Sequence, residues 1–466
     1  MKKRWLSGIM AGIFLTGMLG GCADKGTELV ETKPAERTEE SSETADASSQ
    51  SSESQETVTE SASTETSAEA TEEAQEFVEV QTVSDSIKTD GWSSLRKSVN
   101  LVNWDLYLYE GQNKNVFYSP FSIVSAMGLT DLAAKGETKE QIEKALHMDD
   151  SEAFRQEMMD YLAKNKESDT TYFRSANAIW LSDKLVLSDS SKTDFFEPAT
   201  KYFGGFAGQL DFQGDLAKSK ETIKDWVSDN TDGFIDDYDS SATEDTFADI
   251  MNAVYFYGEW MNKFKAEDTV DGEFHGTNGD TTEKMMNLSG DRMPYLADKD
   301  GVTALAVPYS DGKLEMDIMM SADEGKTIND VFDPEKADEI LDELDKAEEA
   351  KLGTFRLPKF SMDAKFNNLT DIFKSWGMDA AFSDNADFTG LADKMYISDI
   401  AHQAKLEVDE EGSRAAAVTE AMLGITSIQM PEDEVDFIVD RPFVFVIRDK
   451  ESGIILFTGR INNLGK

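Results

Sequence analysis

The sequence contains very little sulfur or imidazole chemistry. Among 466 residues there is one cysteine, Cys22, and the three histidines His147, His275 and His402 each stand alone. One thiol excludes a disulfide within the chain, and isolated histidines lack the spacing of a metal site. A Gly-x-Ser-x-Gly elbow and a phosphate-binding loop are also missing. We therefore expect no metal, no cofactor and no enzyme; a serine hydrolase triad assembled from distant residues is the alternative.

Positive charge is scarce as well. The chain has 45 Lys and Arg residues against 92 Asp and Glu residues, which gives a formal net charge of −47. Such a chain repels polyanions, so nucleic acid is not an expected partner. The acidic excess favours solubility and does not by itself indicate a function.

Long apolar runs are missing except at the N-terminus. Residues 1–21 combine a basic start with an apolar stretch too short for a membrane span, which predicts a signal peptide. The end of this stretch, Leu19-Gly20-Gly21-Cys22, resembles the bacterial lipoprotein cleavage box. The resemblance implies a lipid on Cys22 that anchors the protein to the extracellular face of a bacterial membrane. A chance cysteine after a signal peptide is the alternative.

The segment that follows lacks the residues needed for a core. Residues 38–75 have no aromatic side chain and consist mainly of Ser, Thr, Glu and Ala. This composition buries too little apolar surface to offset the entropy of ordering. We predict a disordered linker over residues 22–84 and a single folded domain over residues 85–466.

Within this domain the pattern changes from helical to extended. Apolar residues recur at three- and four-residue spacing in 92–112 and 120–136, with Ser119 before Pro120 as a helix start and Thr138 as the cap of a further short helix. Extended patterns follow at residues 172–181, 249–260, 302–310 and 313–321. Asp449–Gly453 separates two apolar runs, as in a hairpin. This order predicts an α+β domain with largely antiparallel sheets.

Four longer segments together carry a family resemblance. They read NVFYSPFSIVSAM at 115–127, NAVYFYGEWMNKF at 252–264, DIAHQAKLEVDEEGSRAAA at 399–417 and RPFVFVIRDKESGIILFTGRI at 441–461. In this order they resemble the serpins, a family of serine protease inhibitors, over essentially the whole domain. The resemblance implies the serpin fold, with three β-sheets, eight or nine helices and an exposed reactive-centre loop.

The resemblance also implies a mechanism. The target protease of a serpin attacks the loop as a substrate, and the cleaved loop inserts as a new strand of the largest sheet before the acyl-enzyme is hydrolysed. We therefore expect a monomeric suicide inhibitor that forms a covalent complex with a serine protease. A non-inhibitory protein that uses the fold for binding or adhesion is the alternative.

An inserted strand must present alternate residues to the two faces of the sheet, and the predicted loop has a sequence that suits this. The resemblance implies a hinge that comprises Glu410, Glu411, Gly412, Ser413, Ala415, Ala416, Ala417 and Thr419. Starting from Ser413, the inward phase is free of charge, whereas Arg414 and Glu420 both fall on the outward phase. A slip of one residue would bury both charges, so we predict that Ser413 faces inward. A surface helix capped by Ser413 is the alternative resting conformation, because alanine is the best helix former.

Two further features of the loop follow from the family pattern. That pattern has an acidic residue where Arg414 stands, and we expect the departure to be tolerated because the side chain faces outward. Counting from Gly412 implies Thr426–Ser427 as the reactive bond, and other bonds from Met422 to Met430 stay open because the loop is long. A small residue before the bond suits an elastase- or subtilisin-like protease.

The resemblance finally places a polar cluster beneath the point at which the sheet opens. Its residues are Ser119, Ser122, Asn252 and His402, with Trp260 at the top of the sheet. Hydrogen bonds within such a cluster would hold the closed sheet in one geometry. The plainer alternatives are an ordinary buried histidine for His402 and core packing for Trp260.

Overall fold

A computed structural model of the chain describes residues 82–112, 114–165, 170–366, 368–413 and 433–465. These residues fall in one compact unit. The predicted signal peptide, Cys22 and the linker up to residue 81 lie outside the described residues, and so does the predicted loop from Arg414 to residue 432.

The described residues contain eight α-helices. They are α1 (Ser94–Tyr109), α2 (Pro120–Asp131), α3 (Gly136–Ala145), α4 (Ser151–Lys164), α5 (Glu197–Phe203), α6 (Leu216–Asn230), α7 (Ala337–Lys346) and α8 (Leu369–Ser375). In the described part of the chain, none of them is both long and apolar enough to span a bilayer.

Capping residues were predicted for two helices, and one of the two caps is present in the structure. The Ser119 side chain accepts a hydrogen bond from the Ser122 amide, and Pro120 occupies the first helical position of α2, as predicted. The prediction that Thr138 caps a helix was wrong. The helix α3 already begins at Gly136, and the Thr138 hydroxyl instead accepts a hydrogen bond from the Asp387 amide.

Ten strands form the larger sheet. Along the sheet they run β1 (Val116–Tyr118), β16 (Ile454–Ile461), β15 (Phe443–Asp449), β9 (Leu314–Ser321), β8 (Val302–Pro308), β7 (Arg292–Lys299), β10 (Glu349–Pro358), β6 (Gly279–Leu288) and β5 (Val270–Gly276), with β14 (Glu434–Ile438) also paired to β10. The predicted hairpin is the β15–β16 pair. The resemblance implied three sheets, whereas the described residues form two, because β7 pairs with β8 along one half and with β10 along the other.

Six strands form the second sheet, which contains the candidate site. Their order is β11 (Phe360–Phe366), β12 (Asp399–Val408), β13 (Gly412–Ser413), β4 (Ala248–Glu259), β2 (Thr171–Ser182) and β3 (Phe206–Leu210). The strands β12 and β4 are parallel neighbours from Asp399 and Asp249 to Gln403 and Ala253. Most other pairs in both sheets are antiparallel, as expected for this α+β domain.

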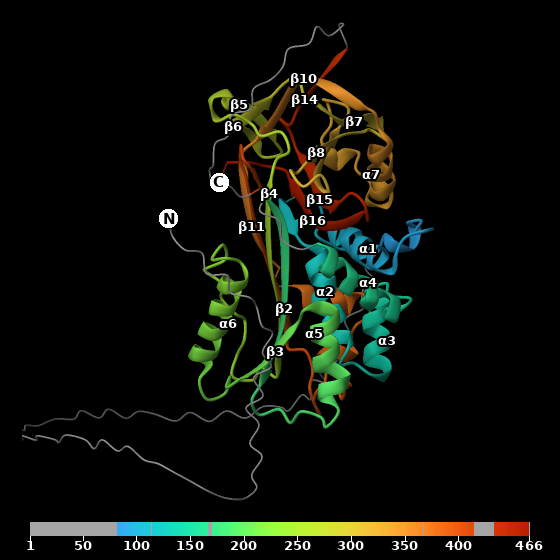
Figure 1. Cartoon of the computed structure of the whole chain (residues 1–466), viewed down its shortest axis with the longest axis vertical. Helices are drawn as coiled ribbons and strands as arrows, with labels where there is room; N and C mark the ends of the chain where they lie inside the picture. The colour runs from blue at the N-terminus through green and yellow to red at the C-terminus, as the bar shows by residue number, and fades with distance from the viewer. Residues whose placement is uncertain (1–81, 113, 166–169, 367, 414–432, 466) are drawn as a thin grey trace, which may run out of the picture. The chain divides into compact units, whose positions relative to one another are not determined.

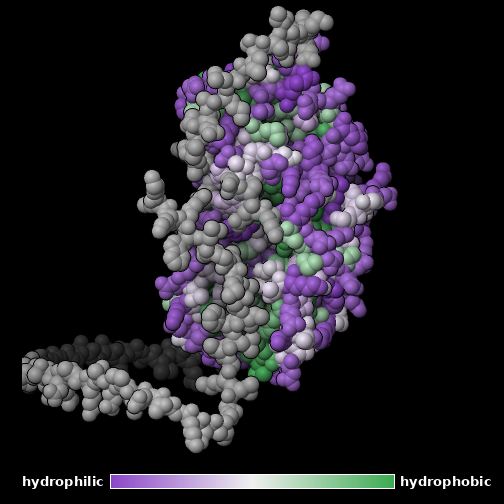
Figure 2. Space-filling model, in the orientation of Figure 1, coloured by the Kyte–Doolittle hydropathy of each residue, from purple (hydrophilic) through white to green (hydrophobic). Residues whose placement is uncertain are grey.

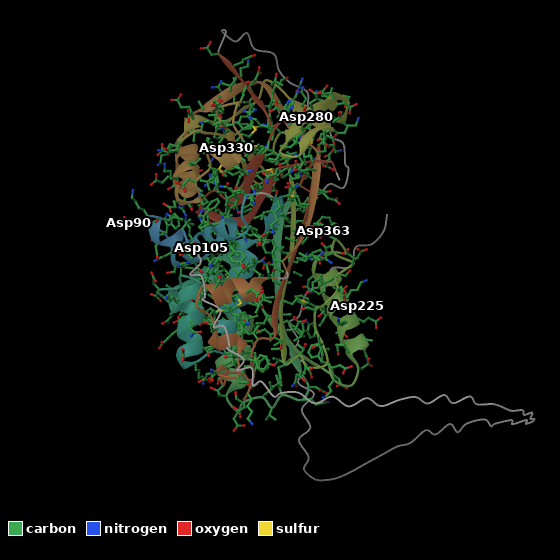
Figure 3. The ribbon with its side chains drawn as sticks, turned by 180° about the vertical axis from the view of Figure 1, so that it is seen from behind. Asp90, Asp105, Asp225, Asp280, Asp330 and Asp363 are labelled. Carbon is green, nitrogen blue, oxygen red and sulfur yellow. The ribbon has the colours of Figure 1, made fainter. Side chains whose placement is uncertain are left out.

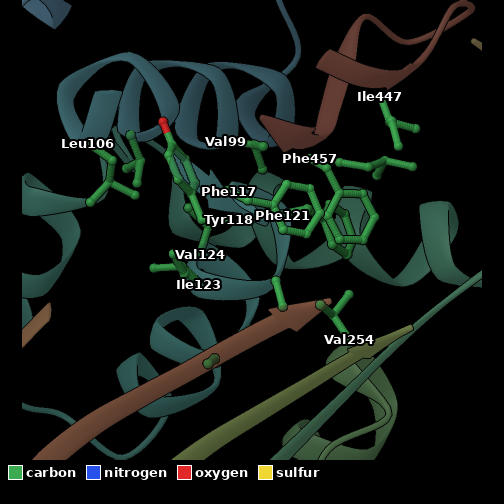
Figure 4. Close-up of a cluster of buried hydrophobic side chains, with 14 of the residues drawn as sticks. Val99, Leu106, Phe117, Tyr118, Phe121, Ile123, Val124, Val254, Ile447 and Phe457 are labelled. Atoms are coloured by element: carbon green, nitrogen blue, oxygen red, sulfur yellow. The ribbon is translucent and has the colours of Figure 1, made fainter. Parts of the chain in front are cut away.

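The two faces of this sheet pack against different cores. Figure 1 shows α6 on one side of β2 and β4, with α2 and α5 on the other side. Val254 of β4 points into the main core, where Figure 4 shows it near Phe121 and Phe457. Met251 of β4 points the other way and belongs to a separate core cluster that includes Ile223 of α6. We call these the inner face and the outer face of the sheet.

The acidic excess is spread over the surface of the domain. Asp90, Asp225, Asp280 and Asp330 are exposed and lie on separate segments of the chain (Figure 3). Figure 2 shows that hydrophilic residues cover most of the described part of one face of the domain. The charge therefore does not mark one surface as a binding site.

Candidate functional site

The last described segment before the predicted loop lies inside the six-stranded sheet. In β13, Gly412 and Ser413 pair antiparallel with Glu259 and Gly258 of β4. On its other side Ser413 pairs antiparallel with Val408 of β12. The chain thus occupies the first two positions of a strand between β12 and β4, which are direct neighbours further along the sheet.

The contacts around β13 explain why a glycine stands at position 412 and a serine at position 413. A Cβ atom at position 412 would overlap the carbonyl oxygen of Gly258, so only glycine fits there in this conformation. Ser413 is fully buried, and its Oγ lies 2.7 Å from the hydroxyl of Tyr309. Burial raises the pKa of Tyr309, so this hydroxyl stays protonated and can donate. Ser413 therefore points to the inner face, the face to which the alternation assigns it.

Trp260 holds the chain just before β13. Its ring stacks on Tyr309 with centroids 4.8 Å apart, and its Nε1 donates to the Asp409 carbonyl oxygen at 2.9 Å. The Trp260 amide donates to the Glu411 carbonyl oxygen, also at 2.9 Å. The side chain is 1% exposed and belongs to the main core. Trp260 thus packs in the core and also binds the hinge.

The two glutamates of the hinge are held by lysines from other segments. Glu410 accepts hydrogen bonds from Lys359 at 2.6 Å and from the Thr269 hydroxyl at 2.8 Å. Burial by itself would raise the pKa of Glu410, but these hydrogen bonds outweigh it and lower the pKa. Glu411 accepts from Lys263 at 2.9 Å. Together these contacts keep the hinge against the end of the sheet.

The structure brings the residues of the polar cluster together on the inner face. His402 and Asn252 are paired across β12 and β4, and the Ser119 amide donates to His402 Nε2 at 3.1 Å. Asn252 Nδ2 donates to Ser175 Oγ at 3.1 Å, and this hydroxyl lies 3.3 Å from Ser122 Oγ. The cluster therefore connects α2, β2, β4 and β12 across the line between β4 and β12.

Sequence reasoning missed Ser175 and Asn177, which belong to the cluster, and Ser125, which extends it. Asn177 accepts from Asn252 Nδ2 at 2.7 Å and donates to Ser125 Oγ at 2.9 Å, and Ser175 links Asn252 to Ser122. Ser175 and Asn177 stand two residues apart in β2, and so face the same side. Polar residues at this spacing in a strand that is otherwise largely apolar were the available signal.

His402 is neutral in this cluster. Its burial lowers its pKa to about 3. Because Nε2 accepts a hydrogen bond from the Ser119 amide, the ring proton is assigned to Nδ1. Across the described ranges, Nδ1 has no hydrogen-bond partner. If the His402 ring bound a second proton, Nε2 would carry an N–H that faces the N–H of Ser119, and the hydrogen bond between them would be lost.

Comparison with known proteins identifies the family. The family model described as serpin (serine protease inhibitor) matches residues 105–464. The chain belongs to the serpin family. An uncharacterized serpin-like protein from Thermococcus kodakarensis is 33% identical over 388 residues, which cover 82% of this chain and 88% of that protein.

Two other proteins are similar to this serpin over most of its length. The leukocyte elastase inhibitor of Sus scrofa is 30% identical over 363 residues, which cover 75% of this chain and 93% of that protein. The native-state crystal structure of the thermophilic serpin tengpin superposes with a TM-score of 0.69 at 23% identity, over 82% of this chain and 99% of that one. The superposition shows that the fold is shared.

The remaining predicted site residues of this serpin lie outside the described residues. They are Cys22, Ala415, Ala416, Ala417, Thr419, Thr426 and Ser427. In the described part of this serpin, no group of three or more His, Cys, Asp or Glu side chains is arranged to hold a metal ion. The described site residues lie in β13 with the segment before it, at Trp260 and in the polar cluster.

Proposed function

We propose that this serpin is a suicide inhibitor of serine proteases, and that cleavage after the hinge lets the following segment insert between β12 and β4. The main support is the position of β13. Gly412 and Ser413 already pair with both strands, antiparallel to each, as the first residues of an inserted strand would. Many serpins are protease inhibitors, and membership of the family supports the same function.

The register of β13 can be continued without a bulge. Because β4 and β12 are themselves in register, each inserted residue would meet a matched pair of neighbours. Ala415 would lie between Phe256 and Leu406, and both of these side chains are buried on the inner face. A small side chain at this position fits the packed core beneath the sheet.

The same register brings Thr419 between Asn252 and His402. A threonine hydroxyl at this point could accept a hydrogen bond from His402 Nδ1, which has no partner among the described residues. Insertion would therefore replace cluster contacts broken by strand separation with contacts to the new strand. Leu423 would then meet Ala248, the first residue of β4.

We further propose Thr426–Ser427 as the reactive bond and an elastase- or subtilisin-like protease as the target. With this bond, the acylated Thr426 would lie three residues beyond the end of β4. The similarity to the leukocyte elastase inhibitor supports the protease class. We also propose that the inhibitor is a monomer and that a lipid on Cys22 anchors it to the extracellular face of a bacterial membrane. Incorporation of a labelled fatty acid that is lost in Cys22→Ser would test the anchor.

The inhibitor proposal is tested by mixing the purified protein with an elastase-like protease. We expect a covalent complex that survives boiling in detergent and contains the protease together with the N-terminal part of the chain. The matched control is the same protease with its catalytic serine replaced by alanine, which should form no such complex. Loop cleavage that leaves the protease fully active would refute inhibition and favour the binding or adhesion alternative.

A further inference from the structure

A small pocket lies where β4 and β12 begin. Its volume is about 260 Å³, just below the range of about 300–1,000 Å³ typical of small-molecule sites, so it suits a ligand the size of one sugar ring. Its polar lining includes the carboxylate of Asp249 and the hydroxyls of Thr243, Thr246 and Ser398. Asp249 lies on the outer face of the sheet, because it stands two residues from Met251 in the same strand.

Asp249 supplies the charge of this pocket. The residue is 2% exposed, and its carboxylate accepts a hydrogen bond from the Ser240 hydroxyl at 2.9 Å. A carboxylate can accept about four hydrogen bonds, so Asp249 can also accept from a ligand. The described residues that line the pocket include no lysine and no arginine, and the neighbouring Glu244 and Asp245 are exposed acids. The pocket therefore attracts a cation and repels a second carboxylate.

Three hydroxyl groups beside this carboxylate are oriented by the backbone. Thr246 Oγ1 accepts from the Thr243 amide at 2.8 Å, and Thr243 Oγ1 accepts from the Asp245 amide at 3.3 Å. Ser398 Oγ accepts from the Phe247 amide at 3.4 Å. In the part of the chain that the structure describes, these hydroxyls accept but do not donate. Each O–H can therefore donate to an oxygen atom of a ligand.

We propose that this pocket binds a small amine that also carries hydroxyl groups, such as an amino sugar. The ammonium group would contact Asp249, and the hydroxyl oxygens of the ligand would accept from the hydroxyls that line the pocket. A neutral sugar lacks the cation, and an amino acid adds a carboxylate that the acidic surroundings repel. A simple alkyl amine offers no acceptor to the hydroxyls. The proposed class of ligand matches both parts of the lining.

The pocket also joins the two strands between which insertion is proposed. Asp249 belongs to β4, whereas Ser398 directly precedes β12 and its amide donates to the Ala248 carbonyl oxygen at 3.4 Å. A ligand that contacts both sides would hold the two strands together at this end. We therefore expect the ligand to hinder insertion, and this part of the inference rests on the proposed function.

The binding site is tested by titrating the full chain with D-glucosamine in a calorimeter. We expect saturable binding of one molecule, about tenfold or more tighter than that of N-acetyl-D-glucosamine, which has the same ring without the cation. Asp249→Asn should weaken glucosamine binding by a similar factor, and asparagine can still accept from Ser240. Asp225→Asn makes the same change of charge at an exposed position of α6 and should bind like the wild type.

Two further variants test the hydroxyls at exposed positions, where folding is less affected than at Asp249. Thr243→Val and Ser398→Ala should each weaken glucosamine binding about two- to tenfold. Ethanolamine, which has one hydroxyl, should bind more weakly than glucosamine. Equal binding of glucosamine and its N-acetyl form, or equal binding by Asp249→Asn and Asp225→Asn, would overturn the site. Binding that is unchanged in both hydroxyl variants would overturn the role of the hydroxyls.

A protease-trapping assay with and without glucosamine tests the effect on insertion. The number of inhibitor molecules consumed per protease trapped should rise with glucosamine in the wild type and stay constant in Asp249→Asn. A constant number in a wild type that binds glucosamine would overturn the effect on insertion. A wild type that binds glucosamine but traps no protease under any condition would overturn the proposed function and leave the binding site standing.

Discussion

Acidification provides a direct test of the polar cluster through His402. Folding lowers the pKa of His402 to about 3 from an ordinary value of 6.5, because the ring is buried. Between these values the unfolded chain binds more protons than the folded chain, so the free energy of unfolding decreases as the pH falls. This contribution is fully present above pH 6.5 and is lost progressively toward pH 3.

The magnitude follows from the same two values. A pH of 5 is 1.5 units below the pKa of the unfolded histidine, whereas His402 in the folded protein is still neutral at this pH. This difference lowers the free energy of unfolding by about 2 kcal/mol. Protonation would also turn Nε2 into a donor facing the Ser119 amide, which lies 3.1 Å away. Acid should therefore weaken the contact that the cluster makes between α2 and β12.

The assay compares urea unfolding of the wild type and of His402→Gln at pH 7.5 and pH 5. Glutamine can accept the Ser119 hydrogen bond but cannot be protonated, so the wild type should lose about 2 kcal/mol more than the variant over this interval. His275→Gln is the control, because His275 is exposed and its pKa is raised by Asp280, which gives the opposite sign. An equal loss in the wild type and in His402→Gln would show that His402 is not the titrating group.

Three further predictions concern the strand position and the buried acids. Ala415→Arg would place a charge on the inner face and should convert the inhibitor into a substrate, whereas Ala416→Arg on the outer face should do much less; equal effects on complex formation would refute the register. Gly412→Ala should expel β13 from the sheet, because the added Cβ would overlap the carbonyl oxygen of Gly258. The buried hydrogen bond of Ser413 would then be lost, which should lower the free energy of unfolding by about 1–3 kcal/mol. An unchanged midpoint of urea unfolding would contradict this. Burial raises the pKa of Glu315 from 4.5 to about 7. Between these values the folded chain binds more protons than the unfolded chain, so the free energy of unfolding should decrease as the pH rises from 4.5 through 7. Glu315→Gln should remove this part of the pH profile, and an identical profile in the variant would refute the assignment.

Sequence reasoning found the parts of this protein that depend on local pattern. Helical spacing and a serine before a proline placed α2, and two apolar runs around Asp449–Gly453 placed the β15–β16 hairpin. Both signals arise within a few residues, so no knowledge of distant contacts was needed. The family resemblance then supplied the order of the segments and the residues to examine at the hinge.

The sequence by itself therefore determined the family, the order of the elements and the inward direction of Ser413. Only the tertiary structure decided how these parts meet. The pairing of β2 with β4 brings Ser175 and Asn177 to Asn252, and the bridge between Trp260 and Tyr309 brings Tyr309 within reach of Ser413. One β-strand shared by two ladders likewise joined sheets that the resemblance had kept apart. These outcomes depend on the register between strands distant in sequence, which is set by the packing of the whole core and leaves no mark in any single segment.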